Sequence, residues 1–403
     1  MIITNPNTDF PTEIVEEGKA KILVPKLKAF IKLPSEYAPS KAPVFYNPVM
    51  ELNRDLAVLA LQTYQKTVNH KISVCEPLAS CGIRGIRFIK EVEGVQKVLI
   101  NDINEKASQL ARYNVQMNGL SKRVTVKNDD ANFLLAHYGA PRKRFDAIDI
   151  DPFGSPVPYL DSAIRALRNG GLLALTATDM APLCGVHPKA CIRKYGGKPL
   201  RTEYCHELAV RLLAGCVAIT AAKYDVGISV VFSHCTDHYI RVYVTAKYGA
   251  KKADESIRNM GYILHCFKCF HRETIRGKLP MENFGKCSEC GSNLNVAGPL
   301  WLAKISDRKF CELMGEEFRQ RDFRFKGRIG KILALITDET EAPVTYYVVD
   351  KLCDALTLPV PPVKKIINAI EKEGFPAFLT HFNPKGVKSN VPAMKIKEIL
   401  RKM

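Results

Sequence analysis

The sequence predicts an α/β fold built on a Rossmann-like open sheet, and three observations lead to this expectation. Short apolar runs alternate with amphipathic segments over residues 72–150, as in a sheet whose parallel strands are joined by helices. The last of these runs, 145–150, is followed at once by an Asp-Pro-Phe-Gly turn at 151–154. Two alternating segments, 224–235 and 239–247, are typical of an antiparallel hairpin that closes such a sheet.

The first predicted strand, 72–75, leads into a turn that ends at Gly82, where a helix begins. Glycine lets the backbone approach a ligand at a helix N-terminus. A dinucleotide-binding turn requires another glycine two residues before Gly82, and Ser80 stands there. The turn is therefore poorly suited to a pyrophosphate, and S-adenosylmethionine, which has no phosphates, fits it better.

Acidic residues follow the next two predicted strands. Asp102 ends the strand at 97–100, where a carboxylate can accept both hydroxyls of a ribose. Asp130 and Ala131 follow the strand at 124–127, in a position suited to the exocyclic amine of adenine. Taken singly, each acid is better explained as a helix cap, with Asp130 opening a helix at Ala131. Three acidic or glycine-rich strand ends in succession favour a nucleoside site.

Asp151 stands at the carboxyl end of a buried strand, where open α/β sheets place their active sites. A carboxylate beside a proline-stiffened turn and the ring of Phe153 can hold the exocyclic amine of a flat base while a methyl group approaches its nitrogen. The alternative is an ordinary turn, because Asp, Pro and Gly are favoured there for backbone reasons. The position after three strand–helix pairs favours amino-methyltransferase chemistry.

Several motifs occur together in a combination specific to one family. They are Val44-Phe45-Tyr46-Asn47-Pro48, Leu52-Asn53-Arg54-Asp55, Gly82 through Phe88, Asn101-Asp102-Ile103, Asp129-Asp130-Ala131-Asn132, Asp151 through Pro156, and the run from Thr176 to Tyr195. On these motifs the chain resembles the tRNA (guanine-26 N2)-dimethyltransferases over most of its length. The resemblance implies a class I S-adenosylmethionine-dependent methyltransferase fold, with a Rossmann-like sheet of seven strands, and the addition of methyl groups to guanine 26 of tRNA.

The resemblance also implies roles for individual residues. It implies that S-adenosylmethionine is bound by Arg54, Arg84, Asp102, Asp130 and Ala131, that Asp151 holds the guanine amine, and that Phe45 and Phe153 stack on the base. Without the resemblance, the residues themselves indicate only Asp102, Asp130, Asp151 and Phe153 as members of the site. Glu76 stands where members of the family often carry aspartate, so we expect it to act on the cofactor only through neighbouring groups.

The spacing of four of the thirteen cysteines predicts a structural zinc site. The start of the chain is polar and carries no secretory signal, so we expect a cytoplasmic protein with reduced thiols. Cys266, Cys269, Cys287 and Cys290 form two C-x2-C pairs separated by seventeen residues. Four thiolates leave no open coordination position, so a Zn²⁺ ion there holds a small ribbon together and performs no chemistry.

The composition and the C-terminal part favour a nucleic-acid partner. Basic residues outnumber acidic ones by 59 to 41, giving a net charge of +18, although a solvated basic surface is the alternative. After residue 344, two helices, a proline-rich break and a turn resemble a winged helix. There Lys364, Lys365, Lys385 and Lys388 would meet a phosphate backbone, unless this part packs on the catalytic domain.

We therefore expect a catalytic domain with an N-terminal extension over 1–250, a zinc-ribbon insertion over 251–298, and a winged-helix-like α+β domain that binds tRNA over 299–403. The apolar stretch 208–222 is too short for a bilayer span and carries Arg211, which favours a buried helix and no membrane association. We expect a monomer without an obligate protein partner.

Two other functions fit parts of the pattern. One is a zinc-containing RNA-binding protein whose methyltransferase fold has lost activity, against which the intact Arg54, Asp102, Asp130 and Asp151 argue. The other is methylation of adenine N6 in DNA or RNA, because that chemistry also places an oxygen before a proline at this strand end. Cofactor binding and the identity of the modified nucleoside distinguish these alternatives.

Overall fold

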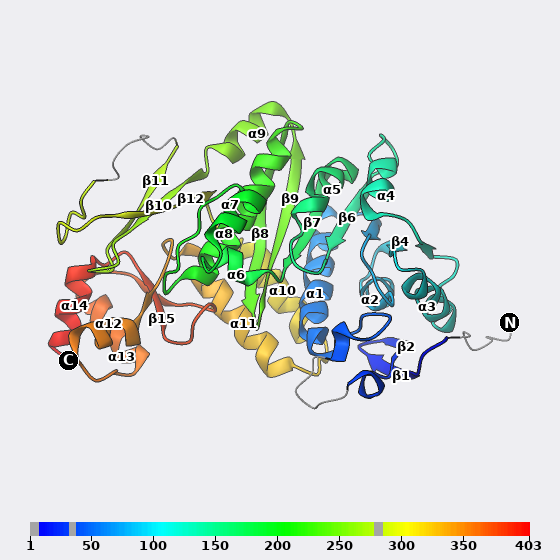
Figure 1. Cartoon of the computed structure of the whole chain (residues 1–403), viewed down its shortest axis with the longest axis horizontal. Coiled ribbons are helices and arrows are strands. Elements are labelled where there is room, and N and C mark those ends of the chain that lie inside the picture. The colour runs from blue at the N-terminus through cyan, green and yellow to red at the C-terminus, as the bar shows by residue number, and fades with distance from the viewer. Residues whose placement is uncertain (1–7, 32–37, 278–284) are drawn as a thin grey trace. The chain divides into compact units, whose positions relative to one another are not determined.

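The computed structural model describes residues 8–31, 38–277 and 285–403 (Figure 1). The chain divides into two compact units, each assembled from separate stretches of sequence. The first unit contains the residues up to Pro152, Pro158–Leu175 and Leu313–Gly330, and the second contains Phe153–Val157, Thr176–Glu312 and the residues from Lys331 onward. The three-part division expected from the sequence remains a prediction.

A mixed seven-stranded sheet confirms the predicted fold class. Its order is β5-β4-β3-β6-β7-β9-β8. The strands are β3 (Ile72–Glu76), β4 (Val95–Asn101), β5 (Val124–Lys127), β6 (Phe145–Ile150), β7 (Leu167–Ala177), β8 (Val226–Thr236) and β9 (Tyr239–Tyr248). The pairs β4–β5, β3–β4, β3–β6 and β6–β7 are parallel, and β8–β9 is antiparallel. Strand order reverses between β3 and β6, which is where open α/β sheets bind their ligands.

Helices alternate with the parallel strands as predicted. Those of the first unit are α1 (Glu51–Val68), α2 (Ile83–Glu91), α3 (Glu105–Met117), α4 (Ala131–Tyr138) and α5 (Leu160–Ala166). Gly82, in the left-handed conformation with φ 80°, precedes α2. A Cβ on Gly85 would lie 2.8 Å from Ile100 Cγ1 and 3.0 Å from Glu76 Oε2. Only glycine there lets α2 lie this close to the sheet.

An N-terminal hairpin precedes the first predicted strand and was not predicted. It consists of β1 (Thr12–Glu17) and β2 (Ala20–Pro25), drawn in dark blue in Figure 1. The side-chain amide of Asn114, on α3, pairs with the β2 backbone: Leu23 N donates to Oδ1 at 2.7 Å, and Nδ2 donates to the Leu23 carbonyl at 3.0 Å. These bonds satisfy buried backbone groups and fix the hairpin on α3.

A basic segment from the far end of the sequence belongs to the first unit. It includes the end of α10 (Arg308–Arg319) and the start of α11 (Lys326–Asp338). Arg321 donates from Nη1 to the Glu91 carbonyl at 2.8 Å and from Nη2 to Gln62 Oε1 at 3.1 Å. No pattern in the sequence indicates a specific contact for this segment, and in the structure Arg321 holds it against α1 and α2.

The second unit is built around one long apolar helix. Its helices include α6 (Met180–Leu183), α7 (Pro188–Tyr195), α8 (Cys205–Ala222) and α9 (Ala250–Ile257). Among the described residues, α8 alone has the length and apolar composition of a membrane span, and 72% of it is buried inside the protein. Arg211 on α8 forms a buried ion pair with Glu207 at 2.8 Å. Both features are those of a core helix.

Two small sheets complete the second unit. One has the order β11-β10-β12, from β10 (Met260–His265), β11 (Arg272–Arg276) and β12 (Asn295–Trp301). The other has the order β13-β15-β14, from β13 (Tyr347–Val348), β14 (Ala377–Leu379) and β15 (Gly386–Ser389), with helices α12 (Val349–Leu356), α13 (Val363–Lys372) and α14 (Ala393–Arg401). Apolar residues of the three helices and the sheet share one core, in agreement with the winged-helix-like expectation.

Lys388 does not lie where the sequence suggested. Its side chain is 2% exposed, with Nζ 3.0 Å from Glu207 Oε2 and 3.4 Å from Glu339 Oε2. A buried ammonium paired with two carboxylates serves the core of the unit, so the expectation that it meets a phosphate backbone was wrong for this residue. Lys364 and Lys365 are exposed on α13.

Candidate active site and zinc site

The predicted site residues of the first unit gather at one edge of the sheet. Glu76 ends β3, Asp102 follows β4, Asp130 follows β5 and Asp151 follows β6. Because these strands are parallel neighbours, their carboxyl ends meet at the same edge. The structure thus brings together residues separated by up to seventy-five positions in the sequence.

Asp102 and Asp130 both bond to nearby backbone N–H groups. Asp102 Oδ2 accepts from Ser80 N at 2.7 Å and Oδ1 from Asn104 N at 2.9 Å, and burial raises the pKa of this carboxyl. Asp130 Oδ1 accepts from Phe133 N at 2.9 Å, so Asp130 is the N-cap of α4, the alternative considered from the sequence. A carboxylate oxygen has more than one lone pair, so both residues can also accept bonds from a ligand.

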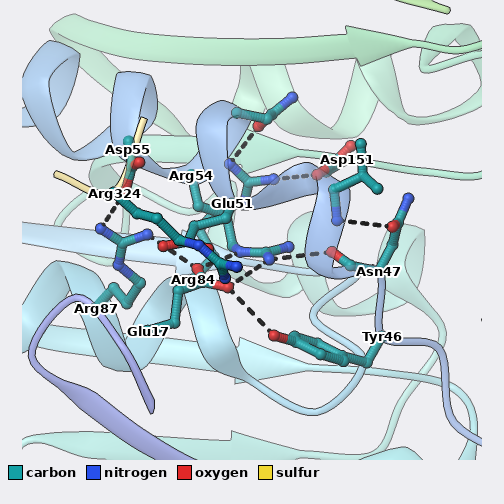
Figure 2. A network of polar contacts seen from close by, with 12 residues as sticks. Glu17, Tyr46, Asn47, Glu51, Arg54, Asp55, Arg84, Arg87, Asp151 and Arg324 are labelled. Carbon is teal, nitrogen blue, oxygen red and sulfur yellow. Dashed lines mark hydrogen bonds and ion pairs between the residues drawn. The ribbon is translucent and has the colours of Figure 1, made fainter. Parts of the chain in front are cut away.

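Arg84 links the strand ends to one another. Its Nη2 forms an ion pair with Asp151 Oδ2 (Figure 2), and its Nη1 donates to Asn53 Oδ1 at 2.9 Å. Its Nε lies 3.6 Å from Glu76 Oε1 and 3.7 Å from Asp149 Oδ1. The guanidinium is therefore surrounded by three acidic side chains, and it fixes the direction in which Asp151 points.

Arg54 belongs to a second buried network that the sequence did not reveal (Figure 2). Its Nε and Nη2 each donate to Glu17 at 2.6 Å, and Nη2 also donates to the Asn47 carbonyl at 3.1 Å. Burial by itself would raise the pKa of Glu17, but the guanidinium groups of Arg54 and Arg87 lower it below its ordinary value. Because Nε and Nη2 are engaged, contact with a cofactor would have to come from Nη1.

The two predicted stacking residues differ in their surroundings. Phe45 is half-buried in the first unit, where its carbonyl accepts a bond from the Ser80 hydroxyl. Phe153 belongs to the second unit and is 76% exposed. The next residue, Gly154, donates from N to Thr178 Oγ1 at 2.8 Å and accepts from Thr178 N at 2.9 Å. This pair of bonds sets the turn that presents the Phe153 ring.

Tyr195 and Asp179 also support this turn, although the sequence predicted no role for either residue. The Tyr195 hydroxyl donates to Asp179 Oδ1 at 2.5 Å, and Lys194 lies 3.0 Å from Asp179 Oδ2. Burial raises the pKa of Tyr195, and a bond from Ser155 opposes that rise. Tyr195 thus joins the turn at Ser155 to the segment around Asp179. The only signal in the sequence was the family motif from Thr176 to Tyr195.

The four predicted zinc ligands lie together in the ribbon of the second unit. Their Sγ atoms are all within 4.8 Å of one another, and two pairs are 3.5 Å apart, Cys266 with Cys290 and Cys269 with Cys287. Zn–S bonds of about 2.3 Å in a tetrahedron place sulfurs about 3.8 Å apart. The residues therefore fit a tetrahedral metal ion with small adjustments.

The two cysteine pairs are held by matching turns. Cys266 N donates to the His271 carbonyl at 2.8 Å, and Phe270 N donates to the Cys266 carbonyl at 2.9 Å. In the second turn Cys287 N and Gly291 N make the corresponding bonds at 2.7 and 2.9 Å. Phe270 and Gly291 hold the same left-handed conformation, with φ of 67° and 69°. This repetition gives both pairs the same geometry toward a shared ion.

The sheet order and the acidic strand ends define an α/β methyltransferase. The family model of the N2,N2-dimethylguanosine tRNA methyltransferases matches residues 18–401, and the chain belongs to this family.

Relatives of known name agree with this assignment. The chain is 45% identical over 393 residues to the tRNA (guanine(26)-N(2))-dimethyltransferase of Methanobrevibacter smithii, and the aligned region covers 98% of each chain. It is 37% identical to the tRNA (guanine(26)-N(2)/guanine(27)-N(2))-dimethyltransferase of Aquifex aeolicus, over 97% of this chain and 95% of that protein. The structure of Trm1 from Pyrococcus horikoshii with S-adenosyl-L-methionine matches with a TM-score of 0.84 at 38% identity, covering 96% of this chain and 99% of that one.

Proposed function

We propose that the protein transfers methyl groups from S-adenosylmethionine to the N2 amine of guanine 26 in tRNA, giving N2-methyl- and N2,N2-dimethylguanosine. The observation that carries this proposal is the family match over residues 18–401, which includes every acidic strand end of the site. The formal charge of +18 suits a polyanionic substrate.

The cofactor would lie along the strand ends of the first unit. Asp102 would accept the ribose hydroxyls, and Asp130 with the buried Ala131 would receive the adenine amine. Arg54 would reach the cofactor through Nη1. Bound S-adenosylmethionine supplies an electrophilic methyl group. Arg84 would contribute to the cofactor site. Its ion pair with Asp151 would also hold the catalytic carboxylate in place.

Asp151 is the residue that would act on the reacting nitrogen. The N2 lone pair of guanine is delocalised into the ring, so the amine is a poor nucleophile and must be oriented. A bond from the N–H to Asp151 would turn the lone pair toward the methyl group, and the carboxylate could take the proton as positive charge develops. The second transfer uses the same geometry on a secondary amine.

A base in a folded tRNA is stacked and must be extruded before it can react, at a cost of a few kcal/mol. Phe45 and Phe153 are the aromatic residues proposed to stack on it. The exposure of Phe153 is compatible with such a role, because a ring that is 76% exposed is accessible to an extruded base. The ribbon would carry Zn²⁺, and the C-terminal α13 face with Lys364 and Lys365 would contact the tRNA. We propose that the enzyme acts in the cytoplasm as a monomer.

Mass spectrometry of nucleosides tests the reaction and the site together. Unmodified tRNA transcript is incubated with the protein and S-adenosylmethionine, and a transcript with guanine 26 replaced serves as the control. We expect N2,N2-dimethylguanosine that disappears in the control. A second transcript with guanine at both 26 and 27 determines whether the neighbouring base is also modified, as the name of the Aquifex aeolicus relative indicates for that protein.

The Asp151→Ala variant tests the mechanism. We expect a loss of methylation by at least about a hundredfold, the usual scale of an acid–base group, with tRNA binding retained. A methylation rate within a few-fold of wild type would show that Asp151 neither orients the amine nor accepts its proton. Methylated adenine in place of methylated guanine would favour the N6 alternative.

A further inference from the structure

A second sulfur-containing cluster lies in the second unit, outside the four-cysteine ribbon. Cys184, Cys205 and His206 each offer one ligand atom, and the three atoms lie within 4.8 Å of one another. Cys184 directly follows α6, whereas Cys205 and His206 open α8. All three side chains are partly exposed, so a small ion from solvent can reach them.

The chemistry of these three groups matches a metal site. We propose that Cys184, Cys205 and His206 bind a second thiophilic divalent metal ion, with Zn²⁺ as the expected occupant. Two thiolates and one imidazole are a known zinc ligand set, which leaves a fourth position open for water. Bond lengths of about 2.0–2.3 Å require the ligand atoms to approach to about 3.5–3.8 Å, a shift that side-chain rotation supplies.

The surroundings of the cluster add two supporting observations. A histidine that binds a metal usually donates its other ring N–H to a carbonyl or carboxylate, and the His206 ring bonds to the Phe382 carbonyl. The Cys235 thiol lies near enough to interact electrostatically with Cys184 and Cys205, so three thiols share this region. Such a concentration of soft ligands favours Zn²⁺ over Mg²⁺ or Ca²⁺.

The site would act by positioning and not by chemistry. Cys184 ends the segment that starts at Thr178, whose backbone and hydroxyl hold the turn at Gly154. Cys184 N also donates to the Met180 carbonyl at 2.7 Å, which joins it to α6. An ion shared with Cys205 would fix this segment to the first residue of α8. It would thereby stabilise the turn that presents Phe153; this consequence rests on the proposed function, whereas metal binding does not.

Zinc content tests the site directly. The full-length protein is purified in the presence of Zn²⁺, dialysed, and analysed by mass spectrometry for metals. We expect about two zinc ions per chain in the wild type and about one in Cys184→Ser and in His206→Ala, because the ribbon keeps its own ion. Cys216→Ser, the same substitution further along α8, is the matched control and should keep about two.

X-ray absorption at the zinc edge tests the site without any variant. The ribbon alone gives only sulfur neighbours at about 2.3 Å, whereas two sites add a nitrogen or oxygen shell at about 2.0–2.1 Å. A sulfur-only spectrum, or one zinc ion in wild type and variants alike, would overturn the proposal. A Cys184–Cys205 disulfide found by thiol counting would overturn it as well. Methylation plays no part in either measurement, so failure of the proposed function is recognised separately.

Discussion

Glu76 provides the sharpest test of the electrostatics at the candidate active site. Its side chain is 3% exposed, and burial raises its pKa from 4.5 to about 8, although the nearby Arg84 guanidinium lowers it. Since the folded protein binds this proton more tightly than the unfolded chain, the stabilisation is complete below pH 4.5 and is lost as the pH rises toward 8.

The Glu76→Gln substitution replaces the protonated acid by a neutral group of the same shape. An amide oxygen can still accept the bond from Gly85 N, which is 2.9 Å long in the wild type. The upper limit of the effect is about 5 kcal/mol, because one pKa unit corresponds to about 1.4 kcal/mol. Relaxation around the Arg84 ion pairs makes the effect smaller than this limit. We expect the free energy of unfolding of Glu76→Gln to increase by about 2–4 kcal/mol relative to that of the wild type as the pH is raised from 5 to 8.5.

Urea unfolding followed by circular dichroism at several pH values measures this difference. The quantity of interest is how the free-energy difference between wild type and Glu76→Gln changes with pH, because any constant offset reports packing. The exposed Glu13→Gln is a matched control that should follow the wild type. A difference between wild type and Glu76→Gln that stays constant from pH 5 to pH 8.5 would refute the reasoning.

Four further substitutions probe the second unit and the turn. Glu289→Ala removes bonds at 3.1 and 2.7 Å to Ala393 N and Met394 N at the start of α14, and should cost about 1–2 kcal/mol in urea unfolding with zinc content unchanged. Lys388→Met leaves two carboxylates buried without their cation and should cost about 3–5 kcal/mol; a cost below about 1 kcal/mol would show that the pairs are not buried in solution. Cys266→Ser should bind one zinc ion fewer than wild type and should have a lower midpoint of thermal unfolding. Equal zinc content in the two proteins would show that the ribbon cysteines do not bind zinc. Phe153→Ala should raise KM for tRNA more than it changes folding stability, because the ring is 76% exposed, and an unchanged KM would exclude stacking on the substrate.

Most elements of the sheet could be predicted because their signals are local. β5 and β6 have the predicted bounds, and β3, β4, β8 and β9 differ from the prediction only at their ends. Burial on both faces makes parallel strands read as continuous apolar runs, and glycine or acidic residues mark their carboxyl ends. The cluster of four cysteines could be predicted for the same reason, since the C-x2-C spacing itself sets the geometry of each turn.

The N-terminal hairpin and its Glu17 carboxylate show where local signals fail. Nothing in the sequence pairs Glu17 with Arg54 and Arg87, because ion pairs between distant positions depend on how the chain packs. Lys388 was misplaced for the same reason: a lysine on a short strand looks the same in the sequence whether it faces solvent or two buried carboxylates. The packing of Arg321 on α1 likewise joins residues more than two hundred positions apart.

The fold class, the cluster of four cysteines and the order of acidic residues along the strands follow from the sequence alone, because periodicity and spacing act over a few residues. Which side chains from distant positions lie together depends on the folded structure: Arg84 is buried among Glu76, Asp149 and Asp151, and the partly exposed Cys184 lies beside Cys205 and His206. The cost of burying a charge or a polar group can be met by a partner from any part of the chain, and which partner meets it is settled only when the chain has folded.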